Sequence, residues 1–350
     1  MRGHPAPPTG WGLLLHAADA ARGRTLDLTQ THGWIARRAG VAATAVDVLL
    51  TSALSHEAAR RTDADADTDL VTLQLGSLRT VTLGAYDTVW AAPPADRGNA
   101  VVAAHLHAAA AALRPSGQAW VLLEDARGAK RYERWVREQF RHVEGAGKRG
   151  GFRLLRAEGP RPVGPLDGPQ AFDTKWGGMQ AYPGAWSAGK LDPGAAFLLE
   201  VLNEAEALRR GQRVWDLGCG FGPLARFAVQ AGCDVTASDD EVDAVDSCRL
   251  NAPGARVLHG ANDACLDGQE SFDVVLINPP HHVGAGVRRD VGRELVRVGW
   301  HRVQPGGALW VVTNTAVPYA QDVPIQASGS VRSGDGRFTV FHWQKPESHR

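Results

Sequence analysis

The sequence predicts an α/β protein built from two tandem copies of one domain, each with a mostly parallel sheet between layers of helices. Chain length, the alternation of strands with helices, and a repeat between the two halves all favour this fold. At about 100–200 residues per domain, 350 residues suffice for two domains. The composition, 44% hydrophobic and 22% charged, is typical of a soluble folded chain. No apolar run approaches the ~20 residues of a membrane span, so we expect a cytoplasmic protein with no membrane partner.

The repeat is clearest in two nine-residue segments. Residues 86–94 read YDTVWAAPP and residues 272–280 read FDVVLINPP, so each joins an aromatic-Asp pair to an apolar strand and two prolines. In both halves a Phe lies 58 residues after the second proline, at Phe152 and at Phe338. Matches in the same order along both halves indicate an internal duplication, and convergent α/β patterning is the alternative.

Short apolar runs alternate with helical patterns in the second half. Residues 213–217 predict its first strand, and residues 223–231 a helix with a proline in the first turn. This alternation indicates a mostly parallel sheet with helices on both faces, in which ligands bind beyond the carboxyl ends of the strands. The remaining elements expected here are a strand at 234–238, a helix at 241–250, and strands at 272–277 and 308–313.

A proline-rich stretch separates the halves. Residues 160–169 (PRPVGPLDGP) hold four prolines and two glycines, which disfavour regular structure. The net charge of zero hides an asymmetry, since residues 1–169 hold 21 Lys/Arg and 17 Asp/Glu, and the remainder 17 and 21. We therefore expect a polyanion to meet mainly the first half. The expected domains are 1–160 and 171–350, joined by a linker at 161–170.

A glycine-rich loop follows the first strand of the second half. Asp216-Leu217-Gly218-Cys219-Gly220-Phe221-Gly222 connects that strand to the next helix. Glycines permit positive φ and let a ligand approach the backbone closely. The spacing differs from the G-x-G-x-x-G pattern of dinucleotide sites, and an acid at the mouth of the loop suits a cationic ligand better than a pyrophosphate. A purely structural turn is the alternative.

Together with the acid that ends the following strand, this loop resembles that of the class I S-adenosylmethionine-dependent methyltransferases. The resemblance implies a Rossmann-like fold with S-adenosylmethionine as the cofactor. It implies that Asp216 lies near the methionine end, that Asp239 takes the ribose hydroxyls, and that Asn262 stands near the adenine. For Asn262 an ordinary polar turn residue is the alternative. The full set of implied cofactor-binding residues is Asp216, Gly218, Gly220, Gly222, Asp239, Asn262 and Asn278.

The segment Asn278-Pro279-Pro280-His281 ends the fourth strand of this half. An exocyclic amine shares its lone pair with its ring and is a poor nucleophile. The Asn oxygen and an adjacent backbone carbonyl can accept its hydrogens and hold it in line with a methyl donor. The segment resembles the (N/D)-P-P-(F/Y) signature of methyltransferases that modify planar amino nitrogens, which implies a catalytic role for these four residues. His281 replaces the usual aromatic, and it stacks less well but offers a hydrogen bond. A plain strand-ending turn is the alternative.

Two upstream segments extend the resemblance. Residues 183–187 (PGAWS) and 191–194 (LDPG) are similar to the stretch before the catalytic domain in bacterial ribosomal RNA guanine-N2 methyltransferases of the RsmC/RlmG type. That family has two tandem methyltransferase-like domains, of which only the second binds cofactor. The resemblance implies methylation of a guanine N2 amine in ribosomal RNA, with the small ribosomal subunit favoured as partner. The alternatives are a glutamine-amide protein methyltransferase and a non-catalytic RNA-binding protein.

The first half lacks both sets of functional residues. Thr29-Gln30-Thr31 aligns with Gly218-Cys219-Gly220, and a β-branched threonine takes positive φ only at a cost. Ala92 aligns with Asn278 and has no acceptor for an amine. We therefore expect only the C-terminal domain to hold an intact cofactor site.

The first half is instead rich in positive charge. Residues 127–161 contain eleven Lys/Arg and four Glu. We expect the side chains that recur at helical spacing to share one helix face and to contact RNA phosphates, with Arg131, Arg134 and Arg141 as the RNA-binding candidates. A solvated basic helix is the alternative. The residues at this spacing are Arg127, Lys130, Arg131, Arg134 and Arg141.

No metal site is expected. The four cysteines form no C-x-x-C pair and are interpreted as reduced thiols. The adjacent pair His281-His282 lacks a nearby third ligand. An exposed acidic loop is expected, rather than a cation site, around Asp63, Asp65, Asp67 and Asp69.

Overall fold

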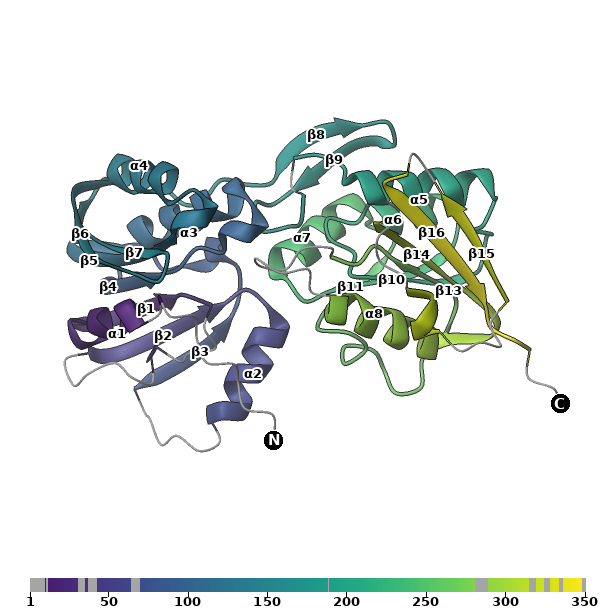
Figure 1. The fold of residues 1–350 in the computed structure, drawn as a ribbon, viewed down its shortest axis with the longest axis horizontal. Coiled ribbons are helices and arrows are strands. Elements are labelled where there is room, and N and C mark those ends of the chain that lie inside the picture. Colours follow the sequence, from purple (N-terminus) through teal and green to yellow (C-terminus); the bar gives the residue numbers. More distant parts are fainter. Residues whose placement is uncertain are drawn as a thin grey trace. The chain divides into compact units, whose positions relative to one another are not determined.

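The chain divides into two compact units, residues 1–168 and 169–350 (Figure 1). The boundary falls inside the proline-rich stretch, after Gly168. Among the residues described, no helix is long and apolar enough to cross a membrane. The computed structural model describes residues 10, 12–30, 35–36, 43–63, 70–187, 189–280, 289–314, 319–323, 328–333 and 336–347.

The first unit contains a seven-stranded sheet in the order β3-β2-β1-β4-β5-β7-β6. The five strands from β3 to β5 are parallel, and β7 and β6 run antiparallel to their neighbours. Its strands are β1 (Gly23–Leu28), β2 (Ala43–Leu50), β3 (Val71–Leu75), β4 (Tyr86–Ala91), β5 (Leu113–Glu124), β6 (Phe140–Arg149) and β7 (Phe152–Pro160). Its helices are α1 (Gly12–Asp19), α2 (Ala53–Asp63), α3 (Asn99–Ala112) and α4 (Ala129–Gln139).

The second unit repeats this topology, with the order β12-β11-β10-β13-β14-β16-β15 and the same parallel and antiparallel pairs. A hairpin, β8 (Gln170–Thr174) and β9 (Gly177–Ala181), precedes it. The sheet strands are β10 (Arg213–Leu217), β11 (Asp234–Asp239), β12 (Arg256–His259), β13 (Phe272–Ile277), β14 (Val303–Asn314), β15 (Ser328–Ser333) and β16 (Phe338–Gln344). The helices are α5 (Pro193–Glu204), α6 (Pro223–Gln230), α7 (Val242–Asn251) and α8 (Arg289–Arg302).

The two units share individual contacts as well as strand order. Strands β4 and β13 have the same burial pattern, in which only the second residue, an Asp, is partly exposed. In the first unit Asp87 accepts a hydrogen bond from the backbone N–H of Arg24 at 2.9 Å. In the second unit Asp273 accepts the equivalent bond from Arg213 at 2.7 Å. The predicted α/β fold with an internal duplication is therefore confirmed.

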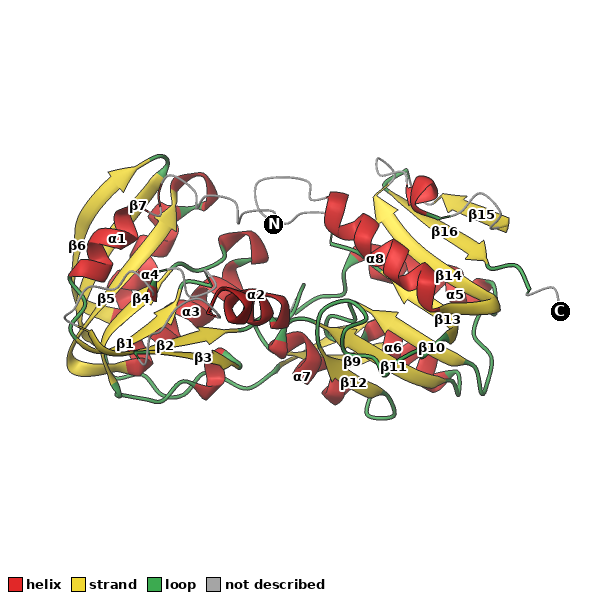
Figure 2. Cartoon of the chain, turned by 90° about the horizontal axis from the view of Figure 1, so that it is seen from below, coloured by secondary structure: helices red, strands yellow, loops and turns green. Residues whose placement is uncertain are grey.

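Residues alternate between two cores along each central strand of the second unit, because successive side chains of a strand point to opposite faces. Val274 and Leu276 of β13 pack with α5, α6 and α7 on one face of the sheet. Val275 and Ile277 pack with α8 on the other face. Figure 2 shows helices on both sides of this sheet. The near-continuous apolar run of β13 follows from this burial on two sides.

The hairpin β8–β9 packs against the glycine loop and against helices α6 and α7. The Phe172 ring meets Phe221 of the glycine loop edge-on, with ring centroids 5.4 Å apart, and Trp176 meets Phe227 of α6 in the same way at 5.4 Å. Asn251 at the end of α7 accepts a hydrogen bond from the Gln180 backbone. Sequence reasoning missed this hairpin, because its short strands carry no strong apolar alternation.

The predicted basic helix face needs correction. Helix α4 ends at Gln139, and Phe140 already begins strand β6. Arg141 therefore lies in a strand, and Arg127 lies in a preceding 3-10 turn at Asp125–Arg127, so the five residues do not share one helix face. Helical spacing continued by chance across a helix–strand junction. Most of the expected acidic loop, residues 64–69, lies outside the described part of the chain, and Asp63 ends α2.

Candidate functional site

The candidate site lies where three parallel strands end together. Strand β10 pairs with β11 on one side and with β13 on the other. In these registers Leu217 stands opposite both Ser238 and Ile277. The residues that follow these strands therefore meet at one edge of the sheet, the usual ligand-binding edge of such folds.

The glycine loop turns sharply at this edge. Gly218, Gly220 and Gly222 all have positive φ, at 78°, 53° and 89°. A Cβ atom built on Gly218 or Gly220 would meet nothing within 4 Å, whereas one on Gly222 would lie 2.7 Å from the Cys248 sulfur. The first two glycines thus leave open space beside the backbone, and Gly222 is required for the packing of α6 against α7.

Asp239, which ends β11, is fixed against this loop. Its Oδ2 accepts a hydrogen bond from the Gly220 backbone N–H at 2.9 Å, and its Oδ1 accepts one from Glu241 at 3.0 Å. The side chain is partly exposed. Loss of water and the neighbouring Asp240 raise the pKa of Asp239 to about 7. A carboxylate held in this way presents its remaining lone pairs to hydroxyl donors.

Asp216 is fully buried at the other end of the loop. Its Oδ2 accepts a hydrogen bond from the Ala225 N–H, in the first turn of α6, at 2.9 Å. Its Oδ1 has no hydrogen-bond partner within the described part of the chain. Burial raises the pKa of Asp216 to about 7. A buried carboxylate oxygen without a donor is costly, and a cationic or N–H-bearing ligand would satisfy it.

The equivalent place in the first unit is filled by its own side chains. Asp27 corresponds to Asp216, and the backbone N–H and the hydroxyl of Thr29 both donate to its Oδ1, at 2.8 and 2.6 Å, while its Oδ2, like Asp216 Oδ1, has no hydrogen-bond partner among the described residues. Gln30 takes a positive φ of 57°, donates to the Leu49 carbonyl at 3.0 Å and accepts from the Thr51 N–H at 3.1 Å. Thr31 lies outside the described residues. Sequence reasoning relied on the threonines and missed the contacts made by Gln30.

A leucine in the first unit occupies the position that the partly exposed Asp239 has in the second unit. Asp27 pairs with Val48 just as Asp216 pairs with Ala237, so Leu50 at the end of β2 occupies the position of Asp239. Leu50 is fully buried and offers no acceptor. The first unit therefore lacks both the open space of the glycine loop and the carboxylate beside it.

Asn278 follows β13 at the same edge of the second sheet. Its side-chain N–H donates to Asp192 Oδ2 at 3.1 Å. Its Oδ1 is buried and has no hydrogen-bond partner among the described residues. Pro279 beside it is buried, whereas His281 and His282 lie outside the described part of the chain. Asn278 thus carries one acceptor atom without a partner within the described part of the chain.

Asn262 lies in the turn after β12, the neighbour of β11. Its φ of 52° is left-handed, which Asn tolerates better than most residues. Its side chain is partly exposed at the carboxyl end of the sheet. The structure therefore brings Asn262 to the same edge as Asp239, Gly220 and Asn278.

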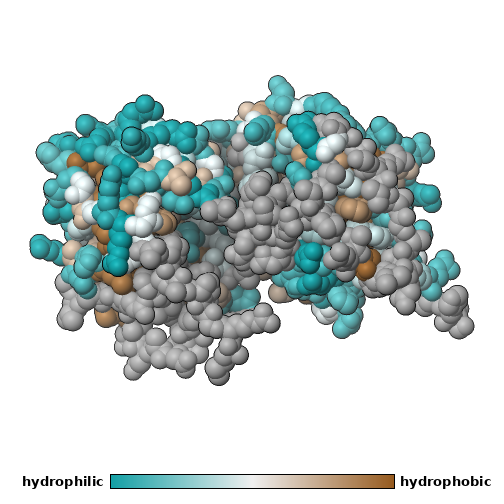
Figure 3. All heavy atoms as spheres, viewed as in Figure 1, coloured by the Kyte–Doolittle hydropathy of each residue, from teal (hydrophilic) through white to brown (hydrophobic). Residues whose placement is uncertain are grey.

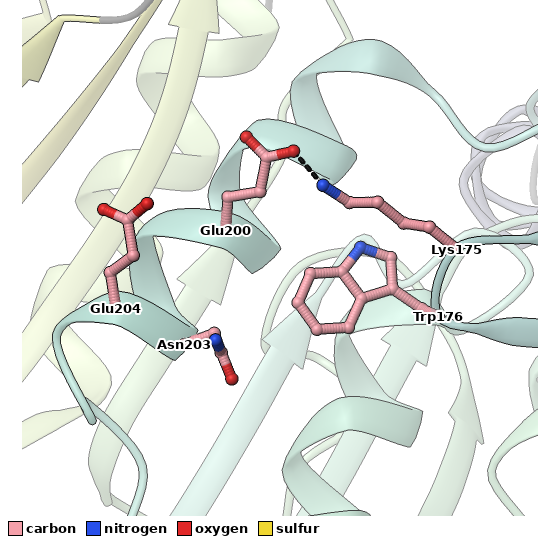
Figure 4. A pocket seen from close by; sticks show the side chains of 5 residues that line it. All are labelled: Lys175, Trp176, Glu200, Asn203 and Glu204. Carbon is pink, nitrogen blue, oxygen red and sulfur yellow. Dashed lines mark hydrogen bonds and ion pairs between the residues drawn. The ribbon is translucent and has the colours of Figure 1, made fainter.

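A shallow hollow of about 280 Å³ lies elsewhere on the second unit (Figure 4). Lys175 pairs with Glu200 across it, and Trp176 faces the same hollow. The other lining residues, Asn203 and Glu204, also belong to α5, and no residue of the candidate site is among them. Within the described ranges no three His, Cys, Asp or Glu side chains gather as metal ligands would. The four cysteines are free thiols.

The chain was compared with known proteins. The family model described as the methyltransferase small domain matches residues 8–156 and again residues 178–341. Ribosomal RNA small subunit methyltransferase C of Chromohalobacter salexigens is 35% identical over 167 residues, which cover 47% of this chain and 50% of that protein. Ribosomal RNA large subunit methyltransferase G of Alcanivorax borkumensis is 31% identical over 202 residues, which cover 55% of this chain and 51% of that protein. The chain thus spans about half the length of these curated relatives.

A solved structure matches almost the whole chain. The 16S rRNA N2 methyltransferase RsmC of T. thermophilus, in complex with AdoMet and guanosine, covers 98% of this chain and 93% of its own. The TM-score is 0.83 and the sequence identity is 29%. The likeness therefore extends over both units.

The raised pKa of Asp216 predicts a pH-dependent stability. A carboxyl group that binds its proton more tightly in the folded state stabilises the fold at low pH, and this contribution is lost as the pH rises from about 4 to about 7. Asp216→Asn keeps an acceptor for the Ala225 N–H and removes the buried charge. We expect it to stabilise the protein relative to wild type by about 1–3 kcal/mol at pH 8.5 and by much less at pH 4.

Calorimetric unfolding at several pH values measures this difference. Asp27→Asn is the matched control, because burial raises the pKa of Asp27 only to about 6, so its stability difference should be smaller and should level off at a lower pH. An Asp216→Asn difference that is the same at pH 4 and pH 8.5 would contradict the prediction.

Proposed function

The chain belongs to the methyltransferase small domain family, and on that basis we propose that it transfers a methyl group from S-adenosylmethionine to a guanine N2 amine in ribosomal RNA. The observation that carries the proposal is the unsatisfied Asn278 Oδ1, held beside a glycine loop with open space along its backbone. Small-subunit RNA is the favoured substrate, and a ribosomal subunit the favoured partner. Both are chosen by similarity to the relatives above.

The residues at the sheet edge fit this cofactor. The unpartnered oxygen of Asp216 suits an ammonium donor at the methionine end, and Asp239 suits the paired hydroxyls of a ribose. Gly218 and Gly220 leave space for close approach, and Asn262, in the turn after β12, is proposed to contact the adenine. When bound, the cofactor supplies an electrophilic methyl group on a positively charged sulfur.

The task of Asn278 is to hold the nucleophile. A guanine amine is planar and weakly nucleophilic because its lone pair is shared with the ring. An acceptor at Asn278 Oδ1 takes one amine N–H and fixes the nitrogen relative to the methyl donor. Holding two reactants in line can contribute on the order of 7–11 kcal/mol to a reaction at best. Pro279 and Pro280 carry no backbone N–H, so they add no competing donor beside the amine.

The first unit supports the proposal through its surface charge. Ion pairs engage Arg127, Arg137, Arg153 and Arg156 with nearby glutamates or Asp125. The pair from Arg134 to Glu138 is long, at 3.8 Å, and exposed, so it contributes little. Figure 3 shows a hydrophilic surface over α4. The basic side chains of residues 127–161 without a carboxylate partner among the described residues are Lys130, Arg131, Arg141, Lys148, Arg149 and Arg161.

We propose that this surface binds RNA phosphates through Arg131, Arg134 and Arg141. Arg131 is held over the Tyr132 ring at 4.9 Å and donates to its hydroxyl, so its guanidinium is oriented in advance. Arg141 is exposed on β6, close to the end of α4. Arg131 and Arg134 thus lie on α4 and Arg141 on the strand that follows it, rather than all three on a single helix face.

The proposed reaction is tested with labelled S-adenosylmethionine and separated ribosomal subunits, purified RNA and ribosomal proteins. Label in guanine N2 of RNA supports the proposal. Label in a glutamine amide of protein would favour the protein methyltransferase, because Asn278 could hold an amide nitrogen in the same way. Transfer to neither would contradict methylation as the function.

Cofactor should bind once per chain. Calorimetry on the full-length protein is expected to give one site, because Thr29 and Gln30 fill the equivalent place in the first unit. Asp239→Ala should abolish most of the binding, whereas Leu50→Ala, its counterpart in the first unit, should leave affinity within a few-fold. Two sites, or a loss caused by Leu50→Ala alone without unfolding, would contradict this prediction.

Asn278→Ala should reduce kcat by roughly 100-fold or more and leave cofactor affinity within a few-fold. Losing one positioned hydrogen-bonding group at a reacting centre commonly costs 10²–10³ in rate. The measurement combines single-turnover methyl transfer with calorimetric binding of the cofactor. A tenfold loss of cofactor affinity would instead make Asn278 a cofactor-binding or structural residue.

Neutralising Arg131, Arg134 and Arg141 to Gln should weaken RNA binding and flatten its dependence on salt. Each lost phosphate contact reduces the slope of log affinity against log salt by roughly 0.7–0.9. The charge-matched control, Arg209, Arg210 and Arg249 to Gln in the second unit, should bind RNA nearly as wild type does. The measurement is the affinity of each variant for ribosomal RNA at several salt concentrations. Equal slopes of log affinity against log salt for the two triple variants would show that the first-unit surface does not bind RNA phosphates.

A further inference from the structure

Helix α5 begins at the candidate site with an ordinary side-chain cap. Asp192 is its N-cap residue, and its Oδ2 accepts hydrogen bonds from the backbone N–H groups of Gly194 at 2.9 Å and Ala195 at 3.1 Å. Pro193 occupies the first helical position, where its missing N–H costs nothing. By itself this arrangement would stabilise the helix by about 1 kcal/mol.

The same oxygen also receives a third donor. Asn278, 86 residues further along the chain, donates its side-chain N–H to Asp192 Oδ2 at 3.1 Å. An ionised carboxylate only accepts hydrogen bonds, whereas a carboxamide has a donor end and an acceptor end. Asp192 therefore selects one of the two flipped orientations of the Asn278 amide, in which Oδ1 points away from the carboxylate.

The start of α5 is closely fitted to this pair. A Cβ atom on Gly194 would lie 3.0 Å from Asp192 Oδ2 and 3.2 Å from Asn278 Oδ1. A side chain at this position would crowd both groups by a few tenths of an ångström. Farther along, Leu198 and Leu199 of α5 are fully buried in the core beneath the sheet. The cap is thus anchored by a rigid helix.

We propose that Asp192 is a positioning residue for methyl transfer, which orients the Asn278 carboxamide so that its oxygen faces the substrate amine. This inference rests on the proposed function and deepens it. Without the carboxylate, the amide can turn its NH₂ toward the substrate, and two donors would then oppose each other. Asp192 contacts neither reactant in this role, and it acts only through Asn278.

Two substitutions separate this role from helix capping. Asn at 192 can still accept from the helix N–H groups and from Asn278, whereas Ser is an equally good cap but is too short to reach Asn278. Asp192→Asn should therefore keep kcat within a few-fold of wild type. Asp192→Ser should lower kcat by roughly 10–100-fold, with cofactor affinity and melting temperature close to those of Asp192→Asn. Equal kcat in the two variants would overturn the proposal.

A double-mutant cycle tests whether Asp192 acts through Asn278. In the Asn278→Ala background, Asp192→Ser should cause no further loss of kcat, because the group that it orients is gone. A full additional loss would show that Asp192 affects the reaction independently, and would overturn the positioning role.

A spectroscopic readout keeps the inference testable if no RNA is methylated and the proposed function fails. The side-chain NH₂ signals of Asn278, assigned by their absence in Asn278→Ala, should show one proton protected from solvent exchange in the wild type. Protection should persist in Asp192→Asn and vanish in Asp192→Ser. Unchanged protection in Asp192→Ser would overturn the inference by itself.

Discussion

A buried carboxylate at the end of the first parallel strand organises each unit. In the second unit Asp216 joins β10 to the first turn of α6 through the Ala225 N–H. In the first unit Asp27, at the same position of β1, accepts the backbone N–H and the hydroxyl of Thr29 through its Oδ1. Both units keep this carboxylate, and in each unit one of its oxygens holds the backbone that follows the strand. In the second unit the glycine loop runs from this anchor to α6.

Much of the fold could be predicted from local sequence. Strands β10 and β13 coincide with the predicted residues, because buried parallel strands read as short apolar runs. Strand β14 starts earlier than expected, at Val303, since its first residue pairs with β13 before a register shift. The glycine loop and Asn278 were recognisable because each depends on a few adjacent residues.

Other features depend on contacts between distant residues and left no local signal. The cap Asp192 meets Asn278 across 86 residues, and the Gln30 side chain reaches the next strand. Arg141 was misplaced because helical spacing in a sequence does not show where a helix ends. The hairpin β8–β9 was missed, although its Phe172 packs against the glycine loop. The segment before β10 thus contributes to the site through two contacts, that of Phe172 with the glycine loop and that of Asp192 with Asn278.

The closed arrangement at the end of β1 makes a ligand site in the first unit costly to introduce by single substitutions. Leu50 is fully buried, and Thr29 and Gln30 each make side-chain hydrogen bonds there, so replacing any one alone would open a gap or leave a polar group without its partner. No single intermediate would gain binding in return for that instability. A unit closed in this way can change its surface without disturbing a ligand site.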